Sequence, residues 1–165
     1  MAIRVIAYSG VHGTGKTTSV YETAAEYKKR GLNVGIILET ARKCPLPVLS
    51  VGCKKPDMMA QLWIYTRQIQ EEIEASIHYD IVVTDRTVVD AIAYTRYFGY
   101  DSMLPAMRMM AYSRVYDEVR FKTLLNNEYC IDDGFRSTED LQQRREIERI
   151  MIDTYMDMHI PIIFE

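Results

Sequence analysis

The sequence predicts an α/β fold in which a five-stranded parallel sheet lies between helices on both of its faces, giving three layers. Two observations carry this prediction. Five short apolar runs alternate along the chain with stretches whose apolar residues recur at helical spacing. The length of 165 residues allows one core and leaves little room for a second. Alternating strands and helices form parallel sheets covered by helices, so we expect a single domain over residues 1–165.

The apolar runs define the expected strands, which cover residues 3–9, 34–38, 81–84, 118–124 and 160–164. The last run contains Pro161. A proline cannot donate a hydrogen bond to a neighbouring strand and is tolerated mainly at an edge or at the start of a strand. We therefore expect the fifth strand at an edge of the sheet.

Helix signals lie between these runs. The first helix ends at Gly31, the second begins after Asp57 as its N-cap, and the third ends at Gly99. Ser137 and Asp140 form a capping box before the last helix. Prolines and a glycine predict an irregular loop over residues 40–55. The expected helices cover residues 16–30, 58–77, 87–98, 104–116 and 138–158.

Composition limits the classes of partner. The net charge of −3 provides no general basic surface and weighs against a nucleic-acid partner. No apolar run approaches the roughly 20 residues that cross a bilayer, so we expect no membrane partner. The three cysteines, Cys44, Cys53 and Cys130, lack paired spacing, which favours reduced thiols and a cytoplasmic protein. A metal site built from Cys44, Cys53 and His78 is disfavoured for the same reason.

Residues 10–17 form the phosphate-binding motif GxxxxGKT, directly after the first expected strand and before the first helix. Glycines allow backbone N–H groups to surround the phosphates, and the helix dipole favours the anion. Lys16 reaches the β and γ phosphates as a catalytic group, and the Thr17 hydroxyl binds Mg²⁺. We expect ATP and Mg²⁺ as cofactors. The predicted nucleotide-binding residues are Gly10, His12, Gly13, Thr14, Gly15, Lys16, Thr17 and Thr18.

Asp85 and Arg86 end the third strand, in the pattern of a Walker B strand whose tip faces the phosphate loop. We expect Asp85 to hold Mg²⁺, directly or through water; the alternative is a helix cap. A guanidinium at the end of a buried strand needs an anionic partner. We favour a phosphate contact for Arg86, which makes it a catalytic and substrate-binding candidate.

Glu39 and Arg42 follow the second strand in the same way. The carboxyl ends of strands surround the ligand crevice in open α/β sheets. Glu39 is the candidate general base for an attacking hydroxyl, and Arg42 can bind an anionic group of the substrate. The alternative is a surface ion pair between the two residues, worth under about 1 kcal/mol.

The second helix carries aromatic and amide side chains that can stack on a base and hydrogen-bond to it. Gln61 and Tyr65 are the substrate-binding candidates, with Trp63 and Gln68 beside them. Aromatic residues at helical spacing are also typical of a core, which is the alternative.

The segment of about residues 126–145 predicts a lid over the triphosphate. Arg136 lies in its loop and is expected to neutralise charge on the transferred phosphoryl group as a catalytic residue. Arg144, Arg145 and Arg149 extend the basic stretch. Their alternative role is to pair with acidic residues on a solvated helix face.

The segments GVHGTGKTT, ETAR, VVTDRTVVDAIAY and DDGFRSTEDLQQRREIERI resemble the P-loop nucleoside and nucleotide kinase-like ATPase domains grouped with bacterial nicotinamide riboside kinase. Deoxynucleoside and thymidylate kinases are related to this group. The resemblance spans nearly the whole chain and implies a P-loop NTPase fold with strand order 2-3-1-4-5. It also implies that Glu39 serves the acceptor, that Asp85 and Arg86 serve metal and phosphate, and that Arg136 reaches the phosphates.

The leading hypothesis is a P-loop kinase that moves the γ-phosphoryl group of ATP, with Mg²⁺, to a nucleoside-like or nucleotide-like small molecule. One alternative is a regulatory NTPase or ligand-sensing module without an acceptor. Another is a kinase acting on a polynucleotide hydroxyl. The absence of an NKxD motif argues against a GTPase. Formation of a homodimer is left open, with methionines at positions 103, 107, 109 and 110 as a soft surface.

Overall fold

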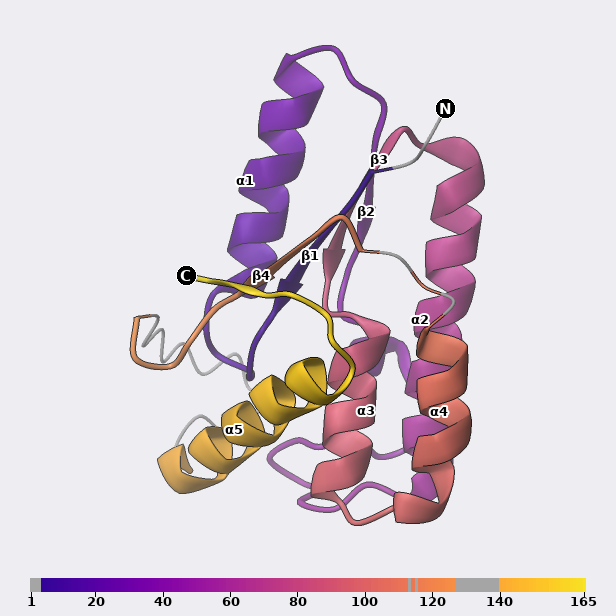
Figure 1. The fold of residues 1–165 in the computed structure, drawn as a ribbon, viewed down its shortest axis with the longest axis vertical. Coiled ribbons are helices and arrows are strands. Elements are labelled where there is room, and N and C mark those ends of the chain that lie inside the picture. Colours follow the sequence, from indigo (N-terminus) through magenta and orange to yellow (C-terminus); the bar gives the residue numbers. More distant parts are fainter. Residues whose placement is uncertain (1–3, 113, 115, 127–139) are drawn as a thin grey trace.

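A computed structural model describes residues 4–112, 114, 116–126 and 140–165. Its centre is a five-stranded sheet with the order β2-β3-β1-β4-β5, in which every neighbouring pair is parallel. The predicted fold class and strand order are therefore confirmed. Figure 1 labels strands β1 to β4 of this sheet. The strands are β1 (Arg4–Ser9), β2 (Val34–Ile37), β3 (Ile81–Asp85), β4 (Glu118–Phe121) and β5 (Ile163–Phe164).

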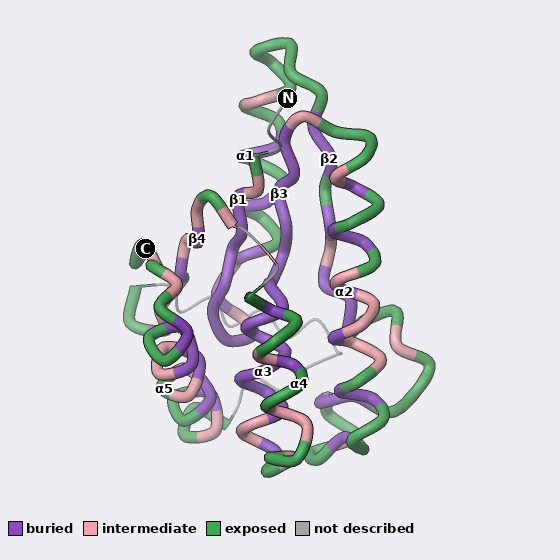
Figure 2. Tube along the Cα trace, turned by 45° about the vertical axis from the view of Figure 1, so that its right-hand side comes forward, coloured by how far each residue is buried: buried purple, intermediate pink, exposed green. Residues whose placement is uncertain are grey.

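Strand β3 and residues 6–9 of β1, at its carboxyl end, are buried (Figure 2). All five residues of β3 are buried, as expected of a strand covered on both faces. Its last residue, Asp85, pairs in register with Tyr8 of β1. The carboxyl ends of the two strands therefore reach the same edge of the sheet together.

Helices cover both faces of the sheet (Figure 1). Helix α1 (Lys16–Lys29) packs Val20 and Ala24 on Ile6 and Tyr8 of β1. Ala7 points to the opposite face because side chains alternate along a strand. That face is covered by α2 (Met58–His78), α3 (Val88–Tyr97) and α5 (Leu141–Asp157), and α4 (Leu104–Ala111) packs on α3.

Side-chain caps mark three helix starts. Asp57 caps α2 as predicted, by accepting a hydrogen bond from the Met59 amide. Thr87 caps α3 instead of beginning it, and its hydroxyl accepts from the amides of Val89 and Asp90. Asp140 caps α5 by accepting from Gln143. The predicted capping-box partner Ser137 lies outside the described residues.

Several predicted boundaries are wrong. The fourth helix ends at Ala111 instead of residue 116, because Arg114 and Tyr116 turn inward to the Glu72 carboxylate. Strand β4 ends at Phe121, three residues early. Strand β5 begins only at Ile163, two residues after Pro161, and its predicted edge position is confirmed.

The segment predicted to be an irregular loop contains one turn of 3₁₀ helix, η1 (Thr40–Lys43), and a single bridge between Ser50 and Cys53. A second 3₁₀ turn, η2 (Asp101–Met103), leads into α4. No helix among the described residues combines the length and apolar character that a membrane crossing requires.

Candidate nucleotide and acceptor site

The phosphate-binding motif forms a tight loop between β1 and α1. Gly13 and Gly15 both have φ near 76°, in the left-handed region that favours glycine. At Gly10, with φ 128°, a Cβ atom would lie 2.4 Å from the carbonyl oxygen of Lys122. Gly15 is the N-cap of α1 and supplies no side-chain cap, so amides of the first turn are available to an anion.

Lys16 points back into this loop. Its ammonium donates to the Val11 carbonyl at 2.7 Å and lies 3.4 Å from the Thr14 hydroxyl. Burial, reinforced by the positive charge of Arg86, lowers the pKa of Lys16 from 10.5 to about 7. A phosphate beside the ammonium favours the charged form again, so the loop is electrostatically prepared for an anion.

The other predicted nucleotide-binding residues occupy two environments. His12 and Thr14 are buried within the loop, and Thr17 and Thr18 lie exposed in the first turn of α1. The Thr14 hydroxyl donates to the Val11 carbonyl at 2.9 Å, which holds the loop in its closed turn. The loop therefore has a fixed interior, and its threonines at the start of α1 face solvent.

Asp85 faces Thr17 across the end of β3. The Thr17 hydroxyl donates to Asp85 Oδ2 at 2.5 Å. Asp85 Oδ1 is buried and has no hydrogen-bond partner among the described residues. Since α3 is capped by Thr87, Asp85 is not the side-chain cap of that helix. A hydroxyl oxygen beside an unsatisfied carboxylate oxygen is a donor set that suits Mg²⁺, so the predicted metal-binding residues fit that ion.

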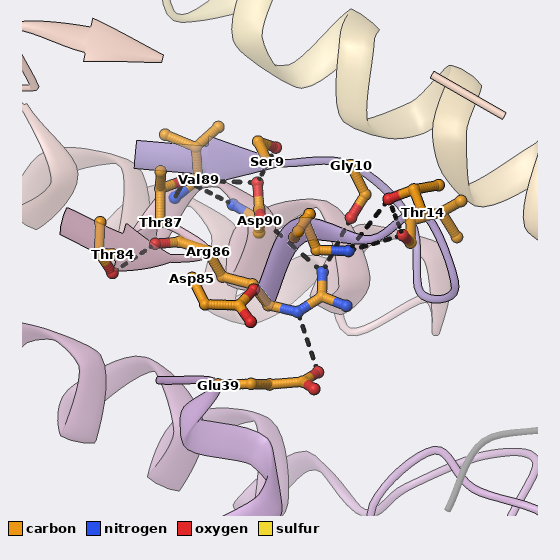
Figure 3. A network of polar contacts seen from close by, with 12 residues as sticks. Ser9, Gly10, Thr14, Glu39, Thr84, Asp85, Arg86, Thr87, Val89 and Asp90 are labelled. Atoms are coloured by element: carbon orange, nitrogen blue, oxygen red, sulfur yellow. Dashed lines mark hydrogen bonds and ion pairs between the residues drawn. The ribbon is translucent and has the colours of Figure 1, made fainter. Parts of the chain in front are cut away.

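Arg86 is the centre of a buried polar network (Figure 3). Its Nε donates to Glu39 Oε1 at 3.0 Å, and its Nη1 lies 3.7 Å from Asp90 Oδ2. Nη1 also donates to the Gly10 carbonyl at 3.2 Å. The guanidinium carbon lies 5.2 Å from the centre of the Tyr94 ring, within the range of a cation–π contact. The side chain predicted to contact phosphate therefore already joins the strand ends to the phosphate loop.

The backbone of Arg86 is unusual, because its φ of 86° lies in the left-handed region. Such a conformation costs about 1–3 kcal/mol in a non-glycine residue and persists only where its surroundings enforce it. Here the Arg86 amide donates to the Tyr8 carbonyl at 2.9 Å. The Arg86 carbonyl accepts from the Thr84 hydroxyl at 2.9 Å and from Gln68 Nε2 at 3.3 Å. These bonds aim the side chain at Glu39.

Glu39 lies between β2 and η1, and its carboxylate bridges two arginines. Oε1 accepts from Arg86, and Oε2 accepts from Arg42 Nε at 3.2 Å. The Arg42 side chain is 47% exposed, whereas that of Arg86 is 8% exposed. The surface pair considered as an alternative is therefore present, but the same carboxylate also belongs to the buried network.

A pocket opens beside this network, with an empty volume of about 450 Å³ that includes space open to solvent. Its polar lining comes from Thr40, Gln61, Gln68, Arg86 and Thr87, and Tyr94 and Phe98 supply aromatic walls. The remainder is aliphatic and comes from Ala41, Val48, Leu49, Ile64 and Ala91. A mostly apolar pocket with a few convergent polar groups is typical of small-molecule sites.

The structure separates the two substrate-binding candidates on α2. Gln61 lines the pocket. Tyr65 is fully buried in the core and is absent from the pocket lining, and its hydroxyl donates to the Met107 carbonyl at 2.6 Å. Burial, together with the charge of Glu72, raises the pKa of Tyr65 to about 12. Tyr65 is thus placed as a core residue, which was the alternative interpretation.

Sequence reasoning missed a buried cluster behind Arg86. Asp90 Oδ1 accepts from the hydroxyls of Ser9 and Tyr155, which belong to β1 and α5. Burial raises the pKa of Asp90 against the opposing effect of Arg86. A carboxylate within the apolar run VVDAIAY was the available signal, because a charge at a buried helical position needs partners.

The arginines of the predicted lid fall into different environments. Arg136 and most of the segment 126–145 lie outside the described residues. Arg145 and Arg149 are exposed, and Arg149 pairs with Asp153 at 3.3 Å as the alternative expected. Arg144 is buried, and its Nε donates to the His12 carbonyl at 3.2 Å.

The thiols that the sequence analysis considered for a metal site form no such cluster. Cys44 and Cys53 are free cysteines of intermediate burial. The described part of the chain contains no group of three or more histidine, cysteine, aspartate or glutamate side chains arranged to hold a metal ion.

Comparison with solved structures supports the fold at low sequence identity. Thymidylate kinase from Ehrlichia chaffeensis superposes with a TM-score of 0.69 and 16% identity, over 100% of this chain and 93% of that one. Thymidylate kinase from Candida albicans gives 0.65 and 17%, over 98% and 83%.

NadR in complex with NAD and AMP-PNP gives a TM-score of 0.72 and 15% identity, covering 98% of this chain and 44% of that one. The present chain therefore spans less than half of NadR. No curated protein matches the sequence. The family model described as an AAA domain matches residues 5–165. Together with the phosphate-binding loop and the strand order, this match means that the chain belongs to the AAA domain family.

Proposed function

We propose that this protein is an ATP-dependent, Mg²⁺-dependent phosphotransferase that acts on a nucleoside-like or nucleotide-like small molecule. One observation carries the proposal: a single side chain contacts both the pocket and the phosphate loop. Arg86 lines the pocket and also donates to the Gly10 carbonyl of the loop. A second ligand in the pocket would therefore lie beside a nucleotide held by the loop, as transfer between two bound molecules requires.

The cofactors have identifiable ligands. Thr17 and Asp85 would hold Mg²⁺, and Lys16 with the loop amides would hold the triphosphate. When bound, the metal ion supplies positive charge that offsets the charge developing on the transferred phosphoryl group. Catalysis in such a site consists mainly of positioning and charge stabilisation. In its charged form, Lys16 would keep the phosphates against the loop.

The pocket suggests how an acceptor would be recognised. Tyr94 and Phe98 offer aromatic faces to a planar group, and the amides of Gln61 and Gln68 offer hydrogen bonds to its edge. Glu39 does not itself line the pocket but precedes Thr40, which does, and from there it would accept the proton from the acceptor hydroxyl. Arg86 fixes that carboxylate at 3.0 Å, and the half-exposed Arg42 could bind an anionic group on the acceptor.

The structural neighbours support the same class of ligand. Two are thymidylate kinases, and NadR has been solved with NAD and AMP-PNP and with NR. We extend nucleotide and nucleoside-like ligands to this chain on the basis of the shared fold and the pocket beside Arg86. The free thiols of Cys44 and Cys53 suit a reducing cytoplasm, where we place the protein.

The test is ATP turnover with Mg²⁺, measured alone and with nucleosides, nucleoside monophosphates, nicotinamide riboside and oligonucleotides. Both ADP release and transfer of labelled phosphate are scored. A labelled small molecule is the expected result and identifies the acceptor class. ADP release that no acceptor changes, without any labelled product, would favour a regulatory NTPase. Label found only on oligonucleotides would favour a polynucleotide kinase.

A further inference from the structure

Arg144 in the first turns of α5 contacts the back of the phosphate-binding loop. Its side chain is only 2% exposed. Nε donates to the His12 carbonyl at 3.2 Å, and Nη2 donates to the Gly13 carbonyl at 3.3 Å. One guanidinium therefore holds two successive peptide groups at the apex of the GxxxxGKT motif.

The geometry of the peptide bond gives this contact a directional consequence. In a trans peptide the carbonyl and the N–H point to opposite sides. Carbonyls of His12 and Gly13 that face Arg144 therefore turn the amides of Gly13 and Thr14 away from α5. Successive amides oriented to one side form the anion-binding concavity of a phosphate loop. The positive φ of Gly13 permits this arrangement at low cost.

Helix α5 holds Arg144 in a fixed place. One turn along the helix, Glu148 Oε1 accepts from the Leu124 amide at 2.6 Å. Further along, the Tyr155 hydroxyl bonds to Asp90 and lies 2.6 Å from the Thr87 hydroxyl. Ile147 and Met151 are fully buried on the same face. The guanidinium is thus pre-organised by packing, and little rotamer freedom remains to be lost when an anion binds.

We propose that Arg144 is a positioning residue for the phosphate-binding loop: it fixes the orientation of two loop peptides and adds a positive charge behind them. It acts on the polyphosphate of the nucleotide and not on the base or the acceptor. The inference rests on the proposed function only in assuming that the loop binds a nucleoside triphosphate.

The experiment measures binding of Mg²⁺–ATP and of inorganic tripolyphosphate by titration calorimetry on the full chain. Arg144→Met removes the charge and both hydrogen bonds, and Arg144→Lys keeps the charge. The matched control is Arg145→Gln, because Arg145 is the next residue on the same helix and is exposed. Folding of each variant is checked by circular dichroism and by its melting temperature without ligand.

We expect R144M to raise the Kd of both ligands at least tenfold over the wild type. The Kd values of R144K should lie between those of R144M and the wild type, and those of R145Q should stay within twofold of the wild type. A wild-type Kd in folded R144M would overturn the inference, as would an equal loss in R145Q. If R144M does not fold, a wild-type Kd in folded R144K would overturn it. Absence of ATP binding by the wild-type protein would instead refute the proposed function.

Discussion

Arg86 Nε and Glu39 Oε1 lie 3.0 Å apart, and this ion pair joins the carboxyl ends of β3 and β2 inside the protein. The same carboxylate accepts from Arg42 at the surface. Two arginines therefore share one acidic partner but differ in burial, which allows their contributions to stability to be compared directly.

Replacing Arg86 by Met should lower the free energy of unfolding by about 3–5 kcal/mol, because it leaves the carboxylates of Glu39 and Asp90 buried without their guanidinium. Replacing Arg42 by Gln should cost under about 1 kcal/mol, since water replaces that contact. Urea unfolding followed by circular dichroism measures both. Equal losses in the two variants would show that burial does not set the strength of these pairs.

Asp85 should control the dependence on magnesium. Asp85→Asn removes the charge from the carboxylate that Thr17 contacts, and should raise the Mg²⁺ concentration needed for half-maximal ATP turnover by roughly tenfold or more. Asp80→Asn, just before the amino end of the same strand, is the control and should leave the magnesium titration unchanged. An unaltered magnesium dependence of ATP turnover in D85N would show that Asp85 is not a metal ligand.

Gln61 and Tyr65 lie one turn apart on α2 and should respond differently to substitution. Gln61→Met should raise KM for the acceptor about tenfold and leave KM for ATP unchanged, because only the pocket loses an amide. Tyr65→Phe should lower the free energy of unfolding by about 1–3 kcal/mol, since the Met107 carbonyl loses its donor, with KM within twofold. Steady-state kinetics and urea unfolding separate the two effects, and a KM change in Y65F would contradict the core assignment.

Lys16 should couple ATP binding to proton uptake. Its pKa in the free protein is about 7, so at pH 8 most of the folded protein carries a neutral amine, which an adjacent phosphate would reprotonate. Affinity for Mg²⁺–ATP should fall as the pH rises above about 7, by up to roughly tenfold per unit. Calorimetry at pH 8 in buffers with different ionisation enthalpies should detect nearly one proton bound per nucleotide.

The control for this prediction is Lys16→Arg, whose side chain stays charged and should show no proton uptake at pH 8. Raising the pH should change the stability of the fold in the opposite direction to the affinity for ATP. Between pH 7 and 10.5 the unfolded chain binds more protons at Lys16 than the folded chain does, so the contribution of Lys16 to the free energy of unfolding rises with pH. Zero proton uptake in the wild type would contradict the lowered pKa.

Much of the architecture was predictable because local signals and the global fold agree. The GxxxxGKT motif placed the loop, and the alternation of elements gave a parallel sheet. Boundaries failed where tertiary contacts override local preference. Tyr116 leaves its predicted helix because its hydroxyl donates to Glu72. The chain leaves strand β4 after Phe121, and the Leu124 amide donates instead to Glu148 on α5. Neither contact has a signal in the adjacent sequence.

The strand ends allowed the positions of the candidate site residues to be predicted from the sequence. Their long-range interaction partners could not be predicted in this way. Glu39 and Arg86 were placed correctly at the carboxyl ends of their strands, whereas their mutual ion pair depends on β2 lying beside β3. Arg144 shares a helix face with Ile147 and Met151, at spacings of three and seven residues. That spacing is typical of a buried helix face, although we expected Arg144 in a lid or on a solvated face. The loop it contacts is distant in sequence and could not be identified without the structure.

The contacts of the phosphate loop also determine when it forms during folding. Its entry is bonded on both sides by later parts of the chain, because the Tyr8 carbonyl accepts from the Arg86 amide and the Ser9 carbonyl accepts from the Lys122 amide. Contacts between residues so distant in sequence form slowly, and a ribosome releases the chain from its N-terminus first. The motif is therefore synthesised before the segments that bond to it and becomes competent only after they have folded, so ATP binding should report completion of folding.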